Sequence, residues 1–194
     1  MRALVATLSG AVALVIVLGS GSSAASGSSS GTETITGVVS GGAAANLLNS
    51  NSNTPLKFTS LVFSGPVNTS ISNAGLGGGN SKTATHTFVT PAGKFTVTRT
   101  AKSSGQAQPT VTSQSGNTCH FTLNGGTGIY KVVGSKSTGK FAGAAGSGTY
   151  ALTILASADL TAGKTTCSGN NTGKVLATGA SVTFKASGPL TLKT

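Results

Sequence analysis

The feature of this chain that most restricts its fold is a series of short runs in which polar and apolar residues alternate. The clearest case is Thr83–Thr100, where two alternating segments flank a turn-forming Pro-Ala-Gly sequence at 91–93. Alternation with a period of two places apolar side chains on one face of a β-strand, and proline followed by glycine is typical of a tight turn. We therefore predict a β-hairpin in which His86 and Phe88 share one face of the first strand.

Other runs of the same kind predict further strands, separated by clusters of Gly, Pro, Asn and Ser. The predicted strands are Thr32–Val39, Leu56–Phe63, Cys119–Leu123, Thr149–Leu155 and Ala180–Lys193. Gly188-Pro189 in the last run predicts a bend or bulge rather than one continuous strand. Residues 43–53 are expected to form a helical turn or a loop, and 75–80 and 103–117 are expected to form loops.

Counting the runs gives seven to nine strands, and the chain is rich in glycine and poor in aromatic residues. Such a composition suits closely spaced strands and tight turns better than helices. We predict one all-β domain over residues 32–194, an antiparallel β-barrel of about eight strands. A β-sandwich is the alternative that the pattern leaves open.

The N-terminus has the organisation of a signal peptide. Arg2 precedes the apolar run Ala11–Leu18, and small residues follow over 19–25. This arrangement predicts a signal peptide over 1–25 and a flexible tether over 26–31. The apolar run is shorter than the roughly 20 residues that span a bilayer. We expect a secreted, extracellular protein, released or associated with the cell wall, with no transmembrane segment in its mature form.

Cys119 and Cys167 are the only two cysteines of the chain. Thiols oxidise outside the cell, so the predicted export favours a disulfide between them. Their wide separation gives no CxxC spacing, and neither a redox motif nor a zinc site is indicated.

The chain carries 13 lysine and arginine residues against two acidic residues, and its net charge is +11. Such a surplus attracts polyanions such as teichoic acid, acidic polysaccharide, anionic lipid or extracellular DNA. Specific nucleic-acid binding is not expected, because the few aromatic residues are needed for the core. An alternative reading is that scattered lysines simply keep the surface soluble. The candidate polyanion-binding residues are Lys94, Arg99, Lys102, Lys131, Lys136 and Lys140.

Little in the sequence points to catalysis. Acid and base carboxylates would have to be Glu33 and Asp159, and Glu33 lies next to the predicted tether. His86 and His120 fall in predicted strands, where a structural or barrel-lining role is the more common one. We therefore predict no catalytic residue and no metal site.

The segment Gly134–Lys140 has the spacing of a phosphate-binding P-loop. However, Phe141 stands where such a loop needs serine or threonine, and no helix-forming stretch follows. Turn chemistry explains the same residues, and no cofactor is predicted.

Glycine recurs between the strands at 119–123 and 149–155 too regularly for a simple linker. We interpret these glycines as structural residues at turns, bulges and close strand contacts. They are Gly126, Gly128, Gly139, Gly143, Gly146 and Gly148.

Two glycine-rich stretches, Gly125–Tyr130 and Thr138–Tyr150, together with the hairpin around Thr85–Gly93, carry a family resemblance. The chain resembles allene oxide cyclase-like and dirigent-like barrels over roughly Thr83–Leu155, in particular small secreted actinobacterial proteins of unknown function. The resemblance implies an eight-stranded antiparallel barrel whose mouth or interior holds a small apolar molecule. Dirigent-like sites depend on acidic residues in the barrel, which are scarce here, so no site residue is carried over.

The function favoured by these observations is a non-enzymatic extracellular binding or surface-associated module for a polyanion or a small apolar molecule. One alternative is an allene oxide cyclase-like or dirigent-like barrel that acts on a hydrophobic secreted metabolite. Another is a structural cell-wall protein.

Overall fold

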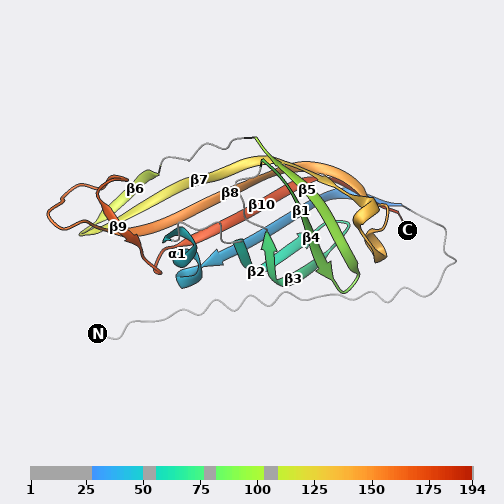
Figure 1. The fold of residues 1–194 in the computed structure, drawn as a ribbon, viewed down its shortest axis with the longest axis horizontal. Coiled ribbons are helices and arrows are strands. Elements are labelled where there is room, and N and C mark those ends of the chain that lie inside the picture. Colours follow the sequence, from blue (N-terminus) through green and yellow to red (C-terminus); the bar gives the residue numbers. More distant parts are fainter. Residues whose placement is uncertain (1–27, 50–55, 77–81, 103–108, 194) are drawn as a thin grey trace, which may run out of the picture.

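A computed structural model of the chain describes residues 28–49, 56–76, 82–102 and 109–193. The predicted signal peptide lies outside these residues. The described part is one antiparallel sheet of ten strands that curls into a half-barrel (Figure 1), and the predicted all-β, barrel-like fold is confirmed. No helix within the described ranges is long and apolar enough to cross a membrane.

The main path of the sheet contains eight strands in the order β3-β2-β1-β10-β8-β7-β5-β4, with β6 paired to β7 and β9 paired to β8. Their bounds are β1 Ser29–Ser40, β2 Leu56–Ser64, β3 Thr69–Leu76, β4 Thr83–Thr90, β5 Gly93–Ala101, β6 Thr110–Ser115, β7 Thr118–Val132, β8 Ala145–Leu160, β9 Thr172–Val175 and β10 Ser181–Leu192. One helix, α1 (Gly41–Asn49), follows β1, and two 3-10 turns, Gly134–Lys136 and Gly139–Phe141, join β7 to β8.

The predicted hairpin is β4 and β5. Phe88 pairs with Phe95 across the two strands, and Gly93 adopts a positive φ of 133° after the turn. On the outer face, threonines of the two strands meet in hydroxyl pairs, for example Thr85 with Thr98 at 3.2 Å. Alternation therefore separates an aromatic inner face from a hydroxylated outer face, as the pattern predicts.

The main core fills the inside of the half-barrel. Edge-to-face contacts join Phe63 to Phe88 and Phe95, and Phe95 to Phe141, with ring centres 5.6–5.9 Å apart. All seven phenylalanines and both tyrosines of the chain are buried. The aromatic residues stabilise the interior, and none lies on the surface where it could stack on a nucleic-acid base.

The last strand differs from the sequence prediction. β10 is continuous through Gly188-Pro189 and pairs with β1 from Ser29↔Leu192 to Ser40↔Ser181 without a shift of register. Its pairing with β8 is interrupted only at these two residues, which accommodates a proline without a backbone N–H. The same pairing extends β1 back to Ser29, into the stretch 26–31 that was expected to be a tether.

Strands β3, β6 and β9 were not predicted. Their sequences are polar, and every side chain of β6 is exposed. Pairing to a longer neighbour, rather than burial of an apolar face, holds such a strand in place. The segment 134–140 leads through its 3-10 turns into strand β8 and not into a helix, which agrees with turn chemistry rather than a P-loop.

Candidate functional site

One row of residues across four neighbouring strands organises the inner face of the half-barrel. Tyr130 on β7 pairs with Gly148 on β8, the register continues to Gly188 on β10, and Gly188 pairs with Glu33 on β1. A Cβ atom at Gly148 would lie 2.7 Å from Cε1 of Tyr130. The two glycines therefore leave room for the tyrosine side chain between the strands that carry Tyr130 and Glu33.

Glu33 is a buried carboxyl group, with only 1% of its surface exposed. Its Oε2 accepts a hydrogen bond of 2.9 Å from the backbone N–H of Val67, and its Oε1 has no hydrogen-bond partner among the described residues. Burial raises the pKa of Glu33 above its ordinary value, and the hydrogen bond from Val67 opposes this rise. This placement corrects the sequence-based expectation, because Glu33 lies inside the fold and not beside a tether.

Tyr130 is the second buried polar group of this row, with 5% of its surface exposed. Its hydroxyl also has no hydrogen-bond partner in the part of the chain that the structure describes. Burial raises the pKa of Tyr130, and the negative charge of Glu33 raises it further. The inner face therefore holds two buried polar groups, a carboxyl group and a phenol, in one row of the sheet.

His86 and Arg99 form a third polar element on the inner face of the β4–β5 hairpin. Arg99 Nε donates a hydrogen bond of 2.9 Å to His86 Nε2. Burial lowers the pKa of His86, and the positive charge of Arg99 lowers it further, so the imidazole is held in its neutral form. Arg99 was expected among the surface cations, and the structure instead places its side chain inside.

A small cavity lies beside His86, Arg99 and Tyr130. It has a volume of about 20 Å³, and its wall includes His86, Arg99, Tyr130, Tyr150 and Phe184. A volume of this size has room for about one water molecule. Among the described residues, three groups have pKa values that depart from their ordinary range. Two of them, His86 and Tyr130, line this cavity, and the third, Glu33, lies two residues from the wall residue Ile35 on the same face of β1. Such a concentration of perturbed groups at a cavity is typical of functional sites.

A test of this electrostatic arrangement compares the parent protein with a Glu33→Gln variant between pH 4 and pH 8. Because the folded protein binds the Glu33 proton more tightly than the unfolded chain does, the carboxyl group stabilises the fold most below its ordinary pKa of 4.5. That contribution is lost as the pH rises through the raised pKa. The melting temperature of the variant, relative to that of the parent, is therefore expected to rise as the pH rises. A difference between the two melting temperatures that does not change with pH would contradict the raised pKa.

His86 contributes to the same curves with the opposite sign. Its folded pKa lies below the ordinary value of 6.5, so its contribution is present above pH 6.5 and is lost as the pH falls through the lowered pKa. Both the parent and the Glu33→Gln variant carry His86. The difference between their curves therefore isolates the effect of Glu33.

The remaining candidate cations lie outside the half-barrel in two groups. Lys94, Lys136 and Lys140 surround the β4–β5 turn, where Thr138 N–H donates to the Lys94 carbonyl at 2.9 Å and Lys140 N–H to the Ala92 carbonyl at 2.9 Å. Lys102 and Lys131 lie on the outer face of the sheet, together with Lys185. Lys185 was missed by the sequence reasoning, because it lies far from the other cations along the chain.

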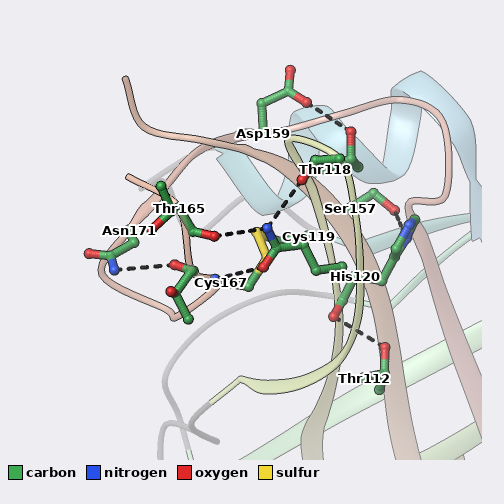
Figure 2. Close-up of a disulfide and its surroundings, with 12 residues drawn as sticks. Thr112, Thr118, Cys119, His120, Ser157, Asp159, Thr165, Cys167 and Asn171 are labelled. Carbon is green, nitrogen blue, oxygen red and sulfur yellow. Dashed lines mark hydrogen bonds between the residues drawn. A yellow bond between two sulfur atoms is a disulfide. The ribbon is translucent and has the colours of Figure 1, made fainter. Parts of the chain in front are cut away.

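The disulfide between Cys119 and Cys167 is present as predicted, with Cα atoms 5.7 Å apart (Figure 2). It fastens the loop between β8 and β9 to β7. Gln114 on β6 supports the same loop, since its Oε1 accepts from Cys167 N–H at 3.2 Å and its Nε2 donates to the Thr165 carbonyl at 3.0 Å. The disulfide therefore lies at the end of the sheet that carries β6 and β9, away from the β4–β5 hairpin.

His120 lies beside the disulfide, and its Nδ1 is 2.8 Å from the buried Oγ of Ser157. Asp159 accepts a hydrogen bond of 3.1 Å from Thr118. These contacts join β7 to β8 and stabilise the pairing of the two strands. No three His, Cys, Asp or Glu side chains in the described ranges are grouped so that they could hold a metal ion.

The predicted structural glycines serve two purposes. Gly126 has a φ of 113° at a bulge where β7 shifts its register against β8, so the glycine-rich stretch is part of a continuous strand. Gly128 allows a close contact, because a Cβ atom there would meet the carbonyl oxygen of Thr100 and the ring of Tyr150. Both purposes need a residue without a side chain.

Comparison of the chain with protein-family models, with curated proteins and with solved structures finds no match in any of the three. The function is therefore inferred from the site alone.

Proposed function

We propose that the protein is a binding module whose half-barrel interior takes up a small, mainly apolar molecule with one hydrogen-bonding group. The observation that carries this proposal is the buried pair Glu33 and Tyr130, in which Glu33 Oε1 and the Tyr130 hydroxyl have no partner among the described residues. Buried polar atoms are nearly always hydrogen-bonded in native proteins, so two exceptions in one row of the sheet call for an explanation. A polar group of a ligand in the cavity would satisfy the hydroxyl of Tyr130, a wall residue, and Glu33 lies two residues from the wall residue Ile35 on the same strand.

The wall of the cavity supports an apolar body for such a ligand. Aromatic and aliphatic side chains, among them Ile35, Phe88, Val97 and Phe184, surround the space next to Tyr130. A ligand larger than a water molecule requires these side chains to move apart. Uptake is therefore expected to be coupled to a rearrangement of the inner face.

The experiment is mass spectrometry of small molecules extracted from the purified protein after secretion by its own host. We expect a retained apolar compound in the parent and its loss in an Ala186→Leu variant, because Ala186 is a buried wall residue and leucine there would fill the cavity. Thr183→Leu, on the outer face of the same strand, is the matched control. Equal retention in all three proteins would contradict an interior site.

A second candidate function is a barrel enzyme that acts on a hydrophobic metabolite, in line with the resemblance to allene oxide cyclase-like barrels. What favours it is a buried carboxyl group and a buried phenol on one inner face, since burial raises the pKa of both Glu33 and Tyr130 and such groups can exchange protons with a bound molecule. If this function holds, the parent yields a converted compound and Glu33→Gln yields the unconverted one. Recovery of the same compound from both proteins would support binding without catalysis.

A further inference from the structure

An open groove of about 350 Å³ lies over strands β10, β8 and β7 on the outer face of the sheet. Its two cationic residues are Lys102, just beyond β5, and Lys185 on β10. From this groove, which shares Tyr150 with the lining of the interior cavity, we infer a second binding site that takes a phosphate group.

The register of the sheet explains how the two lysines come to flank one groove. Lys185 pairs with Ala151, Ala151 pairs with Thr127, and Lys102 N–H donates to the Thr127 carbonyl at 2.9 Å. Neighbouring strands lie about 4.8 Å apart, so the lysine Cα atoms are separated by about 14 Å. Lysine stems are long enough to lean from both sides over the small residues between them.

Hydroxyl groups line the same groove. Thr127 lies between the lysines, and Thr149 and Ser187, which pair with each other, lie one residue pair further along the same face. Each hydroxyl can donate one hydrogen bond to an oxygen of a bound anion. The groove thus offers two positive charges and the hydroxyl groups of Thr127 and Thr149. Ser187 Oγ lies 3.3 Å from Thr34 Oγ1, so its hydroxyl can donate to an anion when Thr34 is the donor of that pair.

No side-chain carboxylate compensates these charges. The whole chain has two acidic side chains, and Glu33 is buried on the inner face of the sheet. Asp159 lies eight residues from Ala151 along β8, which corresponds to about 27 Å in an extended strand. The lysines of the groove are therefore available to an external anion.

The arrangement of donors favours phosphate over carboxylate. A carboxylate is planar and best matched by the fork of an arginine, whereas lysine ammonium groups act as point charges that suit the tetrahedral oxygens of phosphate. The groove contains two lysines and no arginine among its described lining residues. The phosphate can belong to a free small molecule or to a polyol-phosphate polymer of the kind found on cell surfaces.

The test measures the binding of inorganic phosphate, glycerol 3-phosphate, poly(glycerol phosphate) and a polycarboxylate, polygalacturonate, by titration calorimetry at two salt concentrations. The double variant Lys102→Gln/Lys185→Gln is compared with Lys57→Gln/Lys174→Gln, which removes the same charge from exposed lysines on β2 and β9. We expect the groove variant to weaken phosphate binding by about tenfold and the control variant by less than about twofold. Binding to the parent should also weaken as salt rises.

The four ligands decide between the sources of the phosphate. Tight binding of the polymer alone supports a cell-surface polymer, and comparable binding of glycerol 3-phosphate or inorganic phosphate supports a small-molecule ligand. Three results would overturn the site: no binding of any phosphate, an equal loss in both double variants, or tighter binding of polygalacturonate than of poly(glycerol phosphate). The interior variant Ala186→Leu should bind phosphate as the parent does, which keeps this test separate from that of the proposed function.

Discussion

Replacing Cys167 with serine is expected to lower the free energy of unfolding by about 2–5 kcal/mol, the usual effect of removing a native disulfide from a small secreted domain. The bond joins residues 48 positions apart. For a loop of this length, the entropy lost by the unfolded chain corresponds to about 4 kcal/mol. The disulfide also contributes to packing in the native state, because Cys119 is fully buried in a small cluster with Phe121, Ala156 and Ala158, and Cys167 packs against this cluster.

Urea unfolding of the parent and the variant, each with and without a reducing agent, measures this effect. Reduction should lower the free energy of unfolding of the parent to nearly that of the variant, and it should not change the free energy of unfolding of the variant. Cys119→Ala/Cys167→Ala is the control for the free thiol that the single variant leaves in the core. A loss of less than about 0.5 kcal/mol would show that Gln114 and the strand pairing hold the loop without the bond.

Replacing Gly128 with valine is expected to destabilise the fold by about 2–3 kcal/mol or more. A Cβ atom at Gly128 would meet the backbone carbonyl of Thr100 on β5 and lie 2.5 Å from Cε1 of Tyr150. Overpacking in a core typically costs about 1–3 kcal/mol, and here one obstacle is backbone that cannot rotate away. The free energy of unfolding falls because the valine side chain would push β5 away from β7 and displace the ring of Tyr150.

The matched control is Gly75→Val on strand β3, where a Cβ atom would have no atom within 4 Å and φ is not positive. This control should melt within a few degrees of the parent, since valine is favoured in strands. Gly146→Val should behave like Gly128→Val, because its Cβ would meet the carbonyl oxygen of Pro189. Equal melting temperatures for all four proteins would contradict the close strand contacts.

The two proposed sites occupy opposite faces of the same strands. On β8, Thr149 and Ala151 line the outer groove but not the interior cavity, whereas the buried Tyr150 belongs to the lining of both. Alternation along a strand makes this division possible, because successive side chains point to opposite faces. Variants at neighbouring positions of one strand can therefore be used to test the two sites independently.

Sequence reasoning located features that depend on residues close together in the chain. The β4–β5 hairpin, the inward aromatic residues and the overall β-architecture follow from alternation and turn residues that act locally. The disulfide was predicted for a different reason, because the expected export favours oxidation of the only two cysteines of the chain. These predictions needed no knowledge of how distant strands align.

The interior site and the outer groove could not be predicted from residues close together in the chain. Glu33 and Tyr130 are 97 positions apart, and they share one row of the inner face only because β1, β10, β8 and β7 pair in one particular register, across Gly188 and Gly148. Glu33 lies within the predicted strand Thr32–Val39, on the same face as Ile35 and Val39, but it was interpreted as a residue next to the tether. In the structure β1 extends back to Ser29, which places Glu33 inside the strand.

The sequence by itself determined that the protein is a β-protein with a hydrophobic inner face, a cationic surface and one covalent link. The tertiary structure alone decided which strands are neighbours, and thereby that Lys102 and Lys185 flank one groove while Arg99 turns inward to His86. The physical reason is that alternation fixes the face of each side chain, whereas the register between strands is fixed by packing and pairing over the whole sheet. A shift of one residue in any of the central pairings would move Glu33 or Tyr130 to the outer face and abolish the interior site.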